Sequence, residues 1–234
     1  MNPLKLAGLL VSLLRASKST QAFLYGFWNE ELGMLGASPE VLFRLKERDR
    51  PLLETVALAG TLGDHPSVEA FLQDPKEIHE HGLVTEGIRQ ALEPFGKIHL
   101  GTMRAQECGK LTHLMTPIEV ELRQHQSVDE LVAALHPTPA LGGFPKQEAW
   151  RWLEEYAKRI PRGRYGAPAG VLRAGGREMS CYVAIRGMQW NANGFHIGAG
   201  CGVVKASRAE NELAEIERKM SAICHLMGIE YALV

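Results

Sequence analysis

The sequence predicts an α+β fold made of antiparallel sheets with flanking helices. Strand-like segments follow one another in short meanders, and helix-like segments stand in separate blocks, an order typical of this class. A second observation is Asn191-Ala192-Asn193-Gly194, a turn sequence between two strand-like segments that indicates a β-hairpin. The 234 residues are 45% hydrophobic and contain no internal repeat or low-complexity linker, so we expect one domain over residues 1–234.

The first half of the chain is predicted to hold a helix, a three-stranded meander and a second helix. Leucines recur near helical spacing at the start, and strand-forming residues dominate the segments that follow. Ser67 is a plausible N-cap after the last of these strands. In order, the expected elements are a helix at Leu4–Leu14, strands at Ala22–Trp28, Gly33–Leu45 and Leu52–Leu58, and a helix from Pro75 to about Leu92.

The second half is predicted to alternate strands and helices around one rigid loop. Ser127 and Glu130 fit a capping box that opens a helix. Trp150, Leu153 and Ala157 share one face of an amphipathic helix, and we expect that face to lie in the core. The elements are two strands within Lys97–Leu122, helices at Ser127–Leu135 and Lys146–Ile160, strands at Ala169–Arg173, Met179–Trp190 and Phe195–Val204, and a last helix at Ser207–Met227.

Composition excludes several classes of partner and site. The formal net charge of −1 supplies no basic field, so nucleic acid is not an expected partner. The four cysteines lack CxxC spacing, which argues against zinc and disulfides and favours buried thiols in a reducing cytoplasm. No apolar run reaches the roughly 20 residues that span a membrane. Arg15 and Lys18 interrupt the apolar start, which we interpret as an amphipathic helix and not as a leader.

The last predicted helix carries the first candidate site. Glu215 is spaced to neighbour both Glu212 and Lys219 on one helix flank. The preceding segment, Gly198–Val204, is rich in glycine, so a ligand can approach its backbone N–H groups. Taken alone, the helix favours the simpler interpretation of a solvated Glu/Lys pair after a glycine-rich hairpin.

Two further acidic groups are candidates for chemistry. Glu40 follows Pro39 at the start of an apolar strand; if it points inward, loss of solvation raises its pKa and makes it a usable general acid. Strand-edge acids are more often solvated. Glu77 and Glu80 lie three residues apart on a helix and offer the hard oxygens that Mg²⁺ prefers. His79 and His81 flank Glu80 on that helix. Because side chains of adjacent helical residues point about 100° apart, these neighbours cannot share an ion.

A guanidinium and a loop complete the candidates. Arg186 lies in an alternating strand-like run, where it either grips a carboxylate from a rigid strand or faces solvent. The segment His136–Pro145 holds three prolines and two glycines. Rigid loops that present His and Thr are typical walls of binding sites, although composition alone fits a plain connector equally well.

The ordered set of these motifs resembles the chorismate-utilising enzymes, which include isochorismate synthase, anthranilate synthase component I, aminodeoxychorismate synthase and salicylate synthase. Each motif is weak alone, and their common order from about residue 30 onward is specific. The loop His136–Pro145 resembles the isochorismate synthase branch in particular. The matching segments are Gly36–Glu40, Ala59–Thr61, Lys76–Val84, His113–Leu114, His136–Pro145, Tyr165–Gly170, Ala184–Arg186, Gly200–Val204 and Glu212–Lys219.

The resemblance implies chorismate as ligand, Mg²⁺ as cofactor and a role for each matching residue. Protonation makes a hydroxyl a better leaving group, and a dianion needs cationic partners, so these residue types suit the chemistry. The implied roles are Glu40 as general acid on the C4 hydroxyl, Glu80 and Glu215 as Mg²⁺ ligands, Arg186 with backbone near Gly200 and Gly202 on the pyruvyl carboxylate, Lys219 at the other anionic end, and Gly60, Thr61, His136, Thr138 and Ala140 as pocket lining.

One expected part of the family pattern is missing. The resemblance implies a base lysine, upstream of the Ser-Pro-Glu strand, in an N-terminal portion that this sequence lacks; neither Lys5 nor Lys18 has a matching context. Three interpretations stay open: an isochorismate synthase (an isomerase) completed by another chain, a chorismate-binding module without turnover, or a truncated protein. A bare sheet edge also favours either self-association into a homo-oligomer or repacking by the first helix. Cys201 replaces a smaller residue and narrows the implied pocket.

Overall fold

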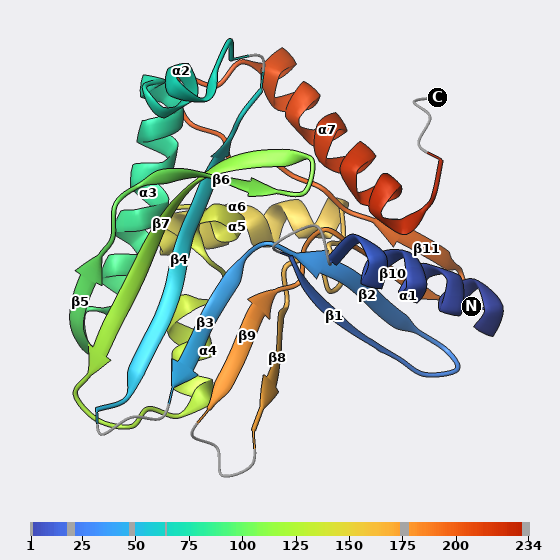
Figure 1. Cartoon of the computed structure of the whole chain (residues 1–234), viewed down its shortest axis with the longest axis horizontal. Coiled ribbons are helices and arrows are strands. Elements are labelled where there is room, and N and C mark those ends of the chain that lie inside the picture. Colours follow the sequence, from blue (N-terminus) through green and yellow to red (C-terminus); the bar gives the residue numbers. More distant parts are fainter. Residues whose placement is uncertain (1, 18–21, 47–49, 64, 174–177, 231–234) are drawn as a thin grey trace.

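Two antiparallel sheets form the frame of the protein, seen in a computed structural model that describes residues 2–17, 22–46, 50–63, 65–173 and 178–230 (Figure 1). The smaller sheet has four strands in the order β1-β2-β10-β11. These are β1 (Phe23–Trp28), β2 (Gly33–Ser38), β10 (Gly187–Asn191) and β11 (Gly194–Ile197).

The larger sheet has seven strands in the order β5-β7-β4-β3-β9-β8, with β6 also paired to β7. Its long central pair, β4 and β7, runs antiparallel from Leu52 opposite Glu121 to Thr61 opposite His113. The strands are β3 (Val41–Lys46), β4 (Leu52–Thr61), β5 (Gly96–Leu100), β6 (Arg104–Cys108), β7 (Leu111–Leu122), β8 (Pro168–Leu172) and β9 (Met179–Val183).

Helices cover each sheet with their apolar stripes. On the larger sheet, α3 (Pro75–Leu92) and α4 (Val128–Leu135) contribute residues such as Ile88 and Leu131 to the main core. On the smaller sheet, α1 (Pro3–Ser17) and α7 (Ala209–Met227) contribute Leu13 and Ile223 to a second core. Burying such side chains stabilises a fold by roughly 1.5–3 kcal/mol each. The remaining helices are α2 (Val68–Leu72), α5 (Pro139–Gly142) and α6 (Lys146–Arg159).

The chain passes between the two sheets at two points that sequence analysis did not predict. Gly33–Leu45 was expected to be one strand, but the chain leaves the smaller sheet after β2 and enters the larger one at β3. Pro39 interrupts the run because it has no N–H to donate. Met179–Trp190 was also expected to be one strand, but it leaves the larger sheet after β9 and enters the smaller one at β10.

Backbone hydrogen bonds hold the two passages, Ser38–Glu40 and Ala184–Arg186, side by side. The Val183 N–H donates to the Glu40 carbonyl at 3.1 Å, and the Ala37 N–H donates to the Arg186 carbonyl at 3.1 Å. Arg186 has φ of 55°, which is uncommon outside glycine and redirects the chain. The prediction that Arg186 lies within a strand was therefore wrong. Both Glu40 and Arg186 lie where the chain changes sheet.

Several local predictions are confirmed. Ser67 caps α2 by accepting from the Ala70 N–H, and Ser127 with Glu130 forms the full capping box of α4. The Asn191–Gly194 turn joins β10 to β11 as an antiparallel hairpin. Helix α3 spans the residues predicted for it. The predicted strand at 195–204 was too long, since β11 ends at Ile197, and 97–122 holds three strands and not two.

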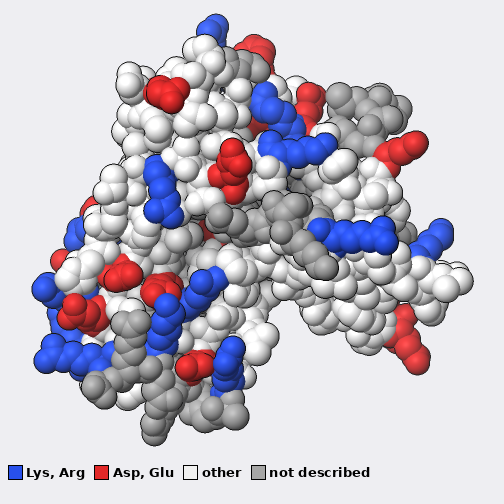
Figure 2. Space-filling view, in the orientation of Figure 1, with Lys and Arg blue, Asp and Glu red and all other residues white. Residues whose placement is uncertain are grey.

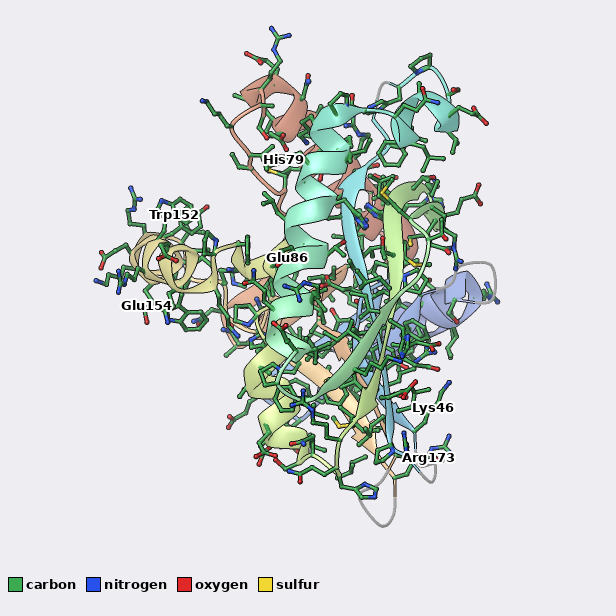
Figure 3. All side chains as sticks on the ribbon, turned by 90° about the vertical axis from the view of Figure 1, so that its left-hand side faces the viewer. Lys46, His79, Glu86, Trp152, Glu154 and Arg173 are labelled. Atoms are coloured by element: carbon green, nitrogen blue, oxygen red, sulfur yellow. The ribbon has the colours of Figure 1, made fainter. Side chains whose placement is uncertain are left out.

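Helix α6 departs from prediction in its packing. Its apolar face was expected to lie in the core, but Trp150 is 45% exposed, Trp152 is 62% exposed, and no residue of α6 is buried. The helix stands out from the body of the molecule, with Trp152 and Glu154 on the projecting part (Figure 3). A hydrophobic stripe shows that a helix has a preferred face, but not that a partner element covers it.

The surface and the cysteines agree only in part with what composition indicated. Basic and acidic side chains are interspersed over the face in Figure 2, as the near-zero net charge leads one to expect. Cys181 and Cys224 are buried, whereas Cys108 and Cys201 are half-buried, so the prediction of four buried thiols was wrong for two. None of the described helices is long and apolar enough to cross a bilayer.

Candidate functional site

Glu40 lies at the first passage between the sheets, with its carboxyl buried. The Thr138 hydroxyl, 98 residues away in sequence, donates a hydrogen bond to its Oε1 at 2.7 Å. Burial raises the pKa of Glu40 to about 7, although the Thr138 hydroxyl and the nearby charges of Lys219 and Arg186 partly oppose the rise. At neutral pH a large fraction of this carboxyl therefore carries a proton that it can donate.

Arg186, at the second passage, points its guanidinium toward the same region. Its Nη2 lies 3.0 Å from Nε2 of His113, and the Nδ1 of that imidazole lies 2.9 Å from the Gly60 carbonyl and 3.2 Å from the Thr61 hydroxyl. Because Nδ1 faces a carbonyl, Nδ1 holds the imidazole proton and Nε2 accepts from the arginine.

Burial is the main reason that His113 stays neutral. Burial and, second to it, the Arg186 charge together lower the pKa of His113 to about 3. The charge of Arg186 thus meets a neutral partner, and among the described residues no carboxylate lies within ion-pair distance of the guanidinium. A cation buried without a counter-ion is costly, so this position favours an incoming anion.

A seam between α3 and α7 gathers four buried carboxylates and two lysines. Lys76 Nζ lies 3.0 Å from Glu77, 3.0 Å from Glu80 and 3.2 Å from Glu212. Lys219 Nζ lies 2.5 Å from Glu215 and 2.7 Å from the Gly200 carbonyl. The isolated-helix interpretation of a solvated Glu/Lys pair was wrong, because these carboxylates are less than a tenth exposed.

The charges of this α3–α7 seam do not balance. Its four carboxylates outnumber its two ammonium groups, and both Glu212 oxygens are buried without a hydrogen bond. Burial raises the pKa of Glu80, and repulsion from Glu215 and Glu77 adds to the rise while Lys76 opposes it. Buried carboxylates in excess favour a cation.

The donor types of the α3–α7 seam fit Mg²⁺, which takes a few carboxylate oxygens and keeps water. The buried Glu212 carboxylate, which shares the ammonium of Lys76 with Glu77 and Glu80, supports this fit. Within the described part of the chain, no three His, Cys, Asp or Glu side chains already surround a single metal position, and the ammonium of Lys76 lies among the acids instead. His79 is exposed while His81 is buried, so the two imidazoles point apart as expected.

Glycine is required at two positions because acidic side chains of α3 approach the backbone there too closely for a Cβ atom. A Cβ on Gly202 would lie 2.4 Å from Glu80 Oε1, and a Cβ on Gly60 would lie 2.8 Å from Glu77 Oε2. Gly60 also has φ of 75°, which favours glycine. The Thr61 N–H donates to Glu77 Oε2 at 3.1 Å, which ties the end of β4 to α3.

The remaining predicted lining residues lie in the His136–Pro145 loop. Thr138 faces Glu40, as described, whereas Ala140 lies in the short helix α5 and packs against the main core. His136 lines a separate cavity beside α6. As for the two upstream lysines, Lys5 is exposed on α1, and Lys18 lies outside the described residues.

The comparisons with known proteins identify the family. A family model described as chorismate binding enzyme matches residues 1–228. The chain belongs to this family. It is 37% identical over 199 residues to the salicylate biosynthesis isochorismate synthase of Pseudomonas aeruginosa, covering 81% of this chain and 40% of that protein. It is 31% identical over 228 residues to the isochorismate synthase MenF of Haemophilus influenzae, covering 93% of this chain and 52% of that protein.

A solved structure agrees with the two-sheet arrangement of this chorismate-binding family member. The menaquinone-specific isochorismate synthase MenF of Escherichia coli superposes with a TM-score of 0.79 at 27% identity, covering 92% of this chain and 51% of the other. The α+β prediction is thereby confirmed. The chain spans about half the length of the curated relatives it matches.

Sequence reasoning assigned no role to Tyr165 and His113, two residues at the centre of the site. The Tyr165 ring lies against Gly198, its hydroxyl lies near Gly200, and burial raises its pKa so that it remains a donor. Both residues stand within segments that match the chorismate-utilising enzymes, which was the available signal. No local sequence pattern indicates the contact between His113 and Arg186, because these residues are 73 positions apart.

Proposed function

We propose that this chain binds chorismate together with Mg²⁺ in the manner of an isochorismate synthase and contributes the acid side of the isomerisation to isochorismate. The observation that supports the proposal most is the pairing of a protonated Glu40 with an anion-seeking Arg186 at the two passages between the sheets. Family membership and the isochorismate synthases among its relatives support the same ligand.

Each group has a role in this proposal. Arg186, held by His113, pairs with the pyruvyl carboxylate, and the backbone around Gly200 and Gly202 supplies further donors. Glu40 donates its proton to the C4 hydroxyl, which leaves as water while another water adds at C2 and the ring double bonds shift. Glu80 and Glu215 would hold Mg²⁺, which supplies positive charge for the ring carboxylate. Lys219 lies beside Glu215 for the same anionic end.

The water that adds at C2 needs a base, and the lysines of the described site are engaged otherwise. Lys76 is bound to three carboxylates, and Lys219 is bound to Glu215 and a carbonyl. A chain that supplies a lysine in trans would complete the enzyme, and a second copy of this chain is one candidate. The alternative function is a chorismate-binding module without turnover, which the same engagement of both lysines favours.

Incubation of the purified protein with chorismate and Mg²⁺, followed by chromatography, tests the proposal. We expect isochorismate from the wild type, alone or mixed with a relative that keeps its base lysine but has its own general-acid glutamate replaced by Gln, and none from Glu40→Gln under either condition. If Glu40→Gln makes isochorismate as fast as the wild type, the acid role is wrong. If no product forms under either condition while chorismate still binds, the binding module is the correct function.

A further inference from the structure

Helix α6 and the His136–Pro145 loop enclose a cavity that the proposed reaction does not use. We call it the α6 cavity; its volume is about 200 Å³. Its apolar lining comes from Pro137 and Leu141 on the loop and from Leu153 and Ala157 on α6. None of Glu40, Thr138, Arg186 or the acids of the α3–α7 seam lines it. Of the residues at the centre of the candidate site, only Tyr165 lines it, so the α6 cavity adjoins that site without containing its charged groups.

Tyr165 lies between the α6 cavity and the candidate site. Its hydroxyl end lies near Gly200, on the side of Arg186 and Glu40, while the residue also lines the α6 cavity. On the cavity side the guanidinium of Arg162 lies over the Tyr165 ring, 5.4 Å from its centroid. The two spaces thus share one aromatic side chain.

The polar lining of the α6 cavity includes an arginine and a histidine whose side chains are incompletely bonded. Arg162 makes one long hydrogen bond, 3.4 Å to the Leu141 carbonyl, and has no ion-pair partner among the described residues. Nδ1 of His136 is buried without a hydrogen bond. Burial, followed by the charges of Lys146 and Arg162, lowers the pKa of that imidazole and keeps it neutral. The guanidinium of Arg162, with its one long hydrogen bond, favours a ligand that brings acceptor oxygens.

The one acid on the rim limits how much negative charge a ligand can carry. Glu154 lines the cavity mouth, where Trp150 Nε1 donates to its Oε1 at 2.8 Å. That hydrogen bond holds the Glu154 carboxylate beside the Trp150 indole, and both side chains line the cavity. A second carboxylate on a ligand would meet this charge, which selects against dianions such as chorismate.

We propose that the α6 cavity is a second binding site, for a small single-ring aromatic monocarboxylate. Arg162 and His136 receive the carboxylate, and the ring lies among Leu141, Leu153 and the Trp150 indole. The volume supports this size, since pockets for drug-sized ligands are larger, roughly 300–1,000 Å³. A planar guanidinium suits both a carboxylate and an aromatic face. The incomplete burial of α6, whose apolar face lacks a covering element, is accounted for by such a ligand.

Calorimetric titration of benzoate into the full chain, without chorismate or Mg²⁺, tests the site. We expect saturable binding that weakens at least tenfold in Arg162→Gln and is lost in Ala157→Phe, which fills the cavity. Arg159→Gln, an exposed arginine in the last turn of the same helix, is the matched control and should bind as the wild type does. Benzyl alcohol, the neutral analogue, should bind at least tenfold more weakly than benzoate.

Arg186 in the candidate site is also proposed to bind an anion, so its contribution is measured separately. Arg186→Gln should leave benzoate binding unchanged. The proposal is overturned if the wild type does not bind benzoate, if Arg162→Gln and Ala157→Phe bind as the wild type does, or if Arg186→Gln abolishes binding. No residue of α6 is buried and Arg162, just beyond that helix, is only half-buried, so we expect the Ala157, Arg159 and Arg162 variants to fold, and circular dichroism checks that they do. Failure here leaves the proposed chorismate function untouched, because neither chorismate nor Mg²⁺ is present.

Discussion

Burial sets the protonation states of the two residues on which the proposed chemistry rests. It raises the pKa of Glu40 to about 7, so that the carboxyl keeps a proton near neutrality. It also lowers the pKa of Arg186, but an arginine has so high an intrinsic pKa that it stays charged. The same desolvation thus produces a neutral acid beside a cation, with His113 held neutral between the cation and the Gly60 carbonyl.

The pKa of Glu40 makes the stability of the protein depend on pH. A carboxyl whose pKa is higher in the folded state than in the unfolded chain stabilises the fold fully at low pH and loses that contribution as pH rises through the folded value. The window runs from about 4.5 to about 7. We expect the wild type to lose about 3 kcal/mol across it relative to Glu40→Gln, as an order of magnitude. Urea unfolding at a series of pH values measures the difference, and parallel curves for the two proteins would contradict it.

The Thr138 hydroxyl is expected to hold the pKa of Glu40 down. Its hydrogen bond to Oε1 favours the charged carboxylate, so Thr138→Val should raise that pKa, by about one unit for a bond to a charged group. Carbon-13 NMR of the glutamate carboxyls reports the titration directly. Thr55→Val is the control, because Thr55 is equally buried but bonds to the Val41 and Leu42 carbonyls instead. An unchanged Glu40 titration in Thr138→Val would show that the hydroxyl does not act on it.

At the scale of the elements, the notable feature is that α3 and α7 meet through their acidic faces. Such packing normally destabilises a protein, and the two lysines of the α3–α7 seam compensate only part of the negative charge. A divalent cation would compensate the rest. We therefore expect the contact between α3 and α7 to tighten when a cation binds to the α3–α7 seam.

Mg²⁺ should therefore raise the unfolding temperature of the protein. A ligand at 100 times its Kd adds about 2.7 kcal/mol of stability, which corresponds to an upward shift of several degrees. Differential scanning calorimetry with and without Mg²⁺ measures it, and Glu80→Gln or Glu215→Gln should lose most of the shift. Glu86→Gln is the matched control, because Glu86 lies on the same helix but is only half-buried and is paired with Arg89. Equal shifts in all four proteins would place the ion elsewhere.

Local elements were predictable where their signals are local, and the site was not. The capping box of α4 and the hairpin turn at Asn191–Gly194 depend on neighbouring residues, and both were predicted correctly. The passages between sheets were missed because strand-like residues continue on both sides of Pro39 in Gly33–Leu45 and throughout Met179–Trp190. The contact of Glu40 with Thr138 joins positions 98 residues apart, which no local pattern encodes. The resemblance to a family named the residues, and only the fold brings them together.

At the scale of the whole molecule, α1 completes the smaller sheet by covering its face together with α7 (Figure 1). Leu13 is fully buried in this second core, whereas its neighbour Leu14 is 53% exposed. Leu13→Ala should therefore cost about 2–5 kcal/mol, and Leu14→Ala less than about 0.5 kcal/mol. Chemical denaturation measures both. Similar small losses for the two variants would show that α1 does not belong to the folded core.

The two-sheet arrangement explains how a chain about half the length of its curated relatives can present a defined site. Both passages between the sheets lie within it, and so do both helices of the α3–α7 seam. The groups proposed to bind the anion, donate the proton and hold the ion therefore come from one chain. The proposed reaction also needs a base. Among the described residues, Lys76 and Lys219 are the lysines of the site, and each is already paired with a carboxylate.

Calorimetric titration of chorismate, with and without Mg²⁺, tests most directly whether these groups form one site for an organic dianion. We expect saturable binding that strengthens at least tenfold when Mg²⁺ is present and is lost in Arg186→Gln. Chorismate binding that is indifferent to both Mg²⁺ and Arg186, or no binding at all, would contradict the assignment of the two sheet passages and the α3–α7 seam to a single ligand.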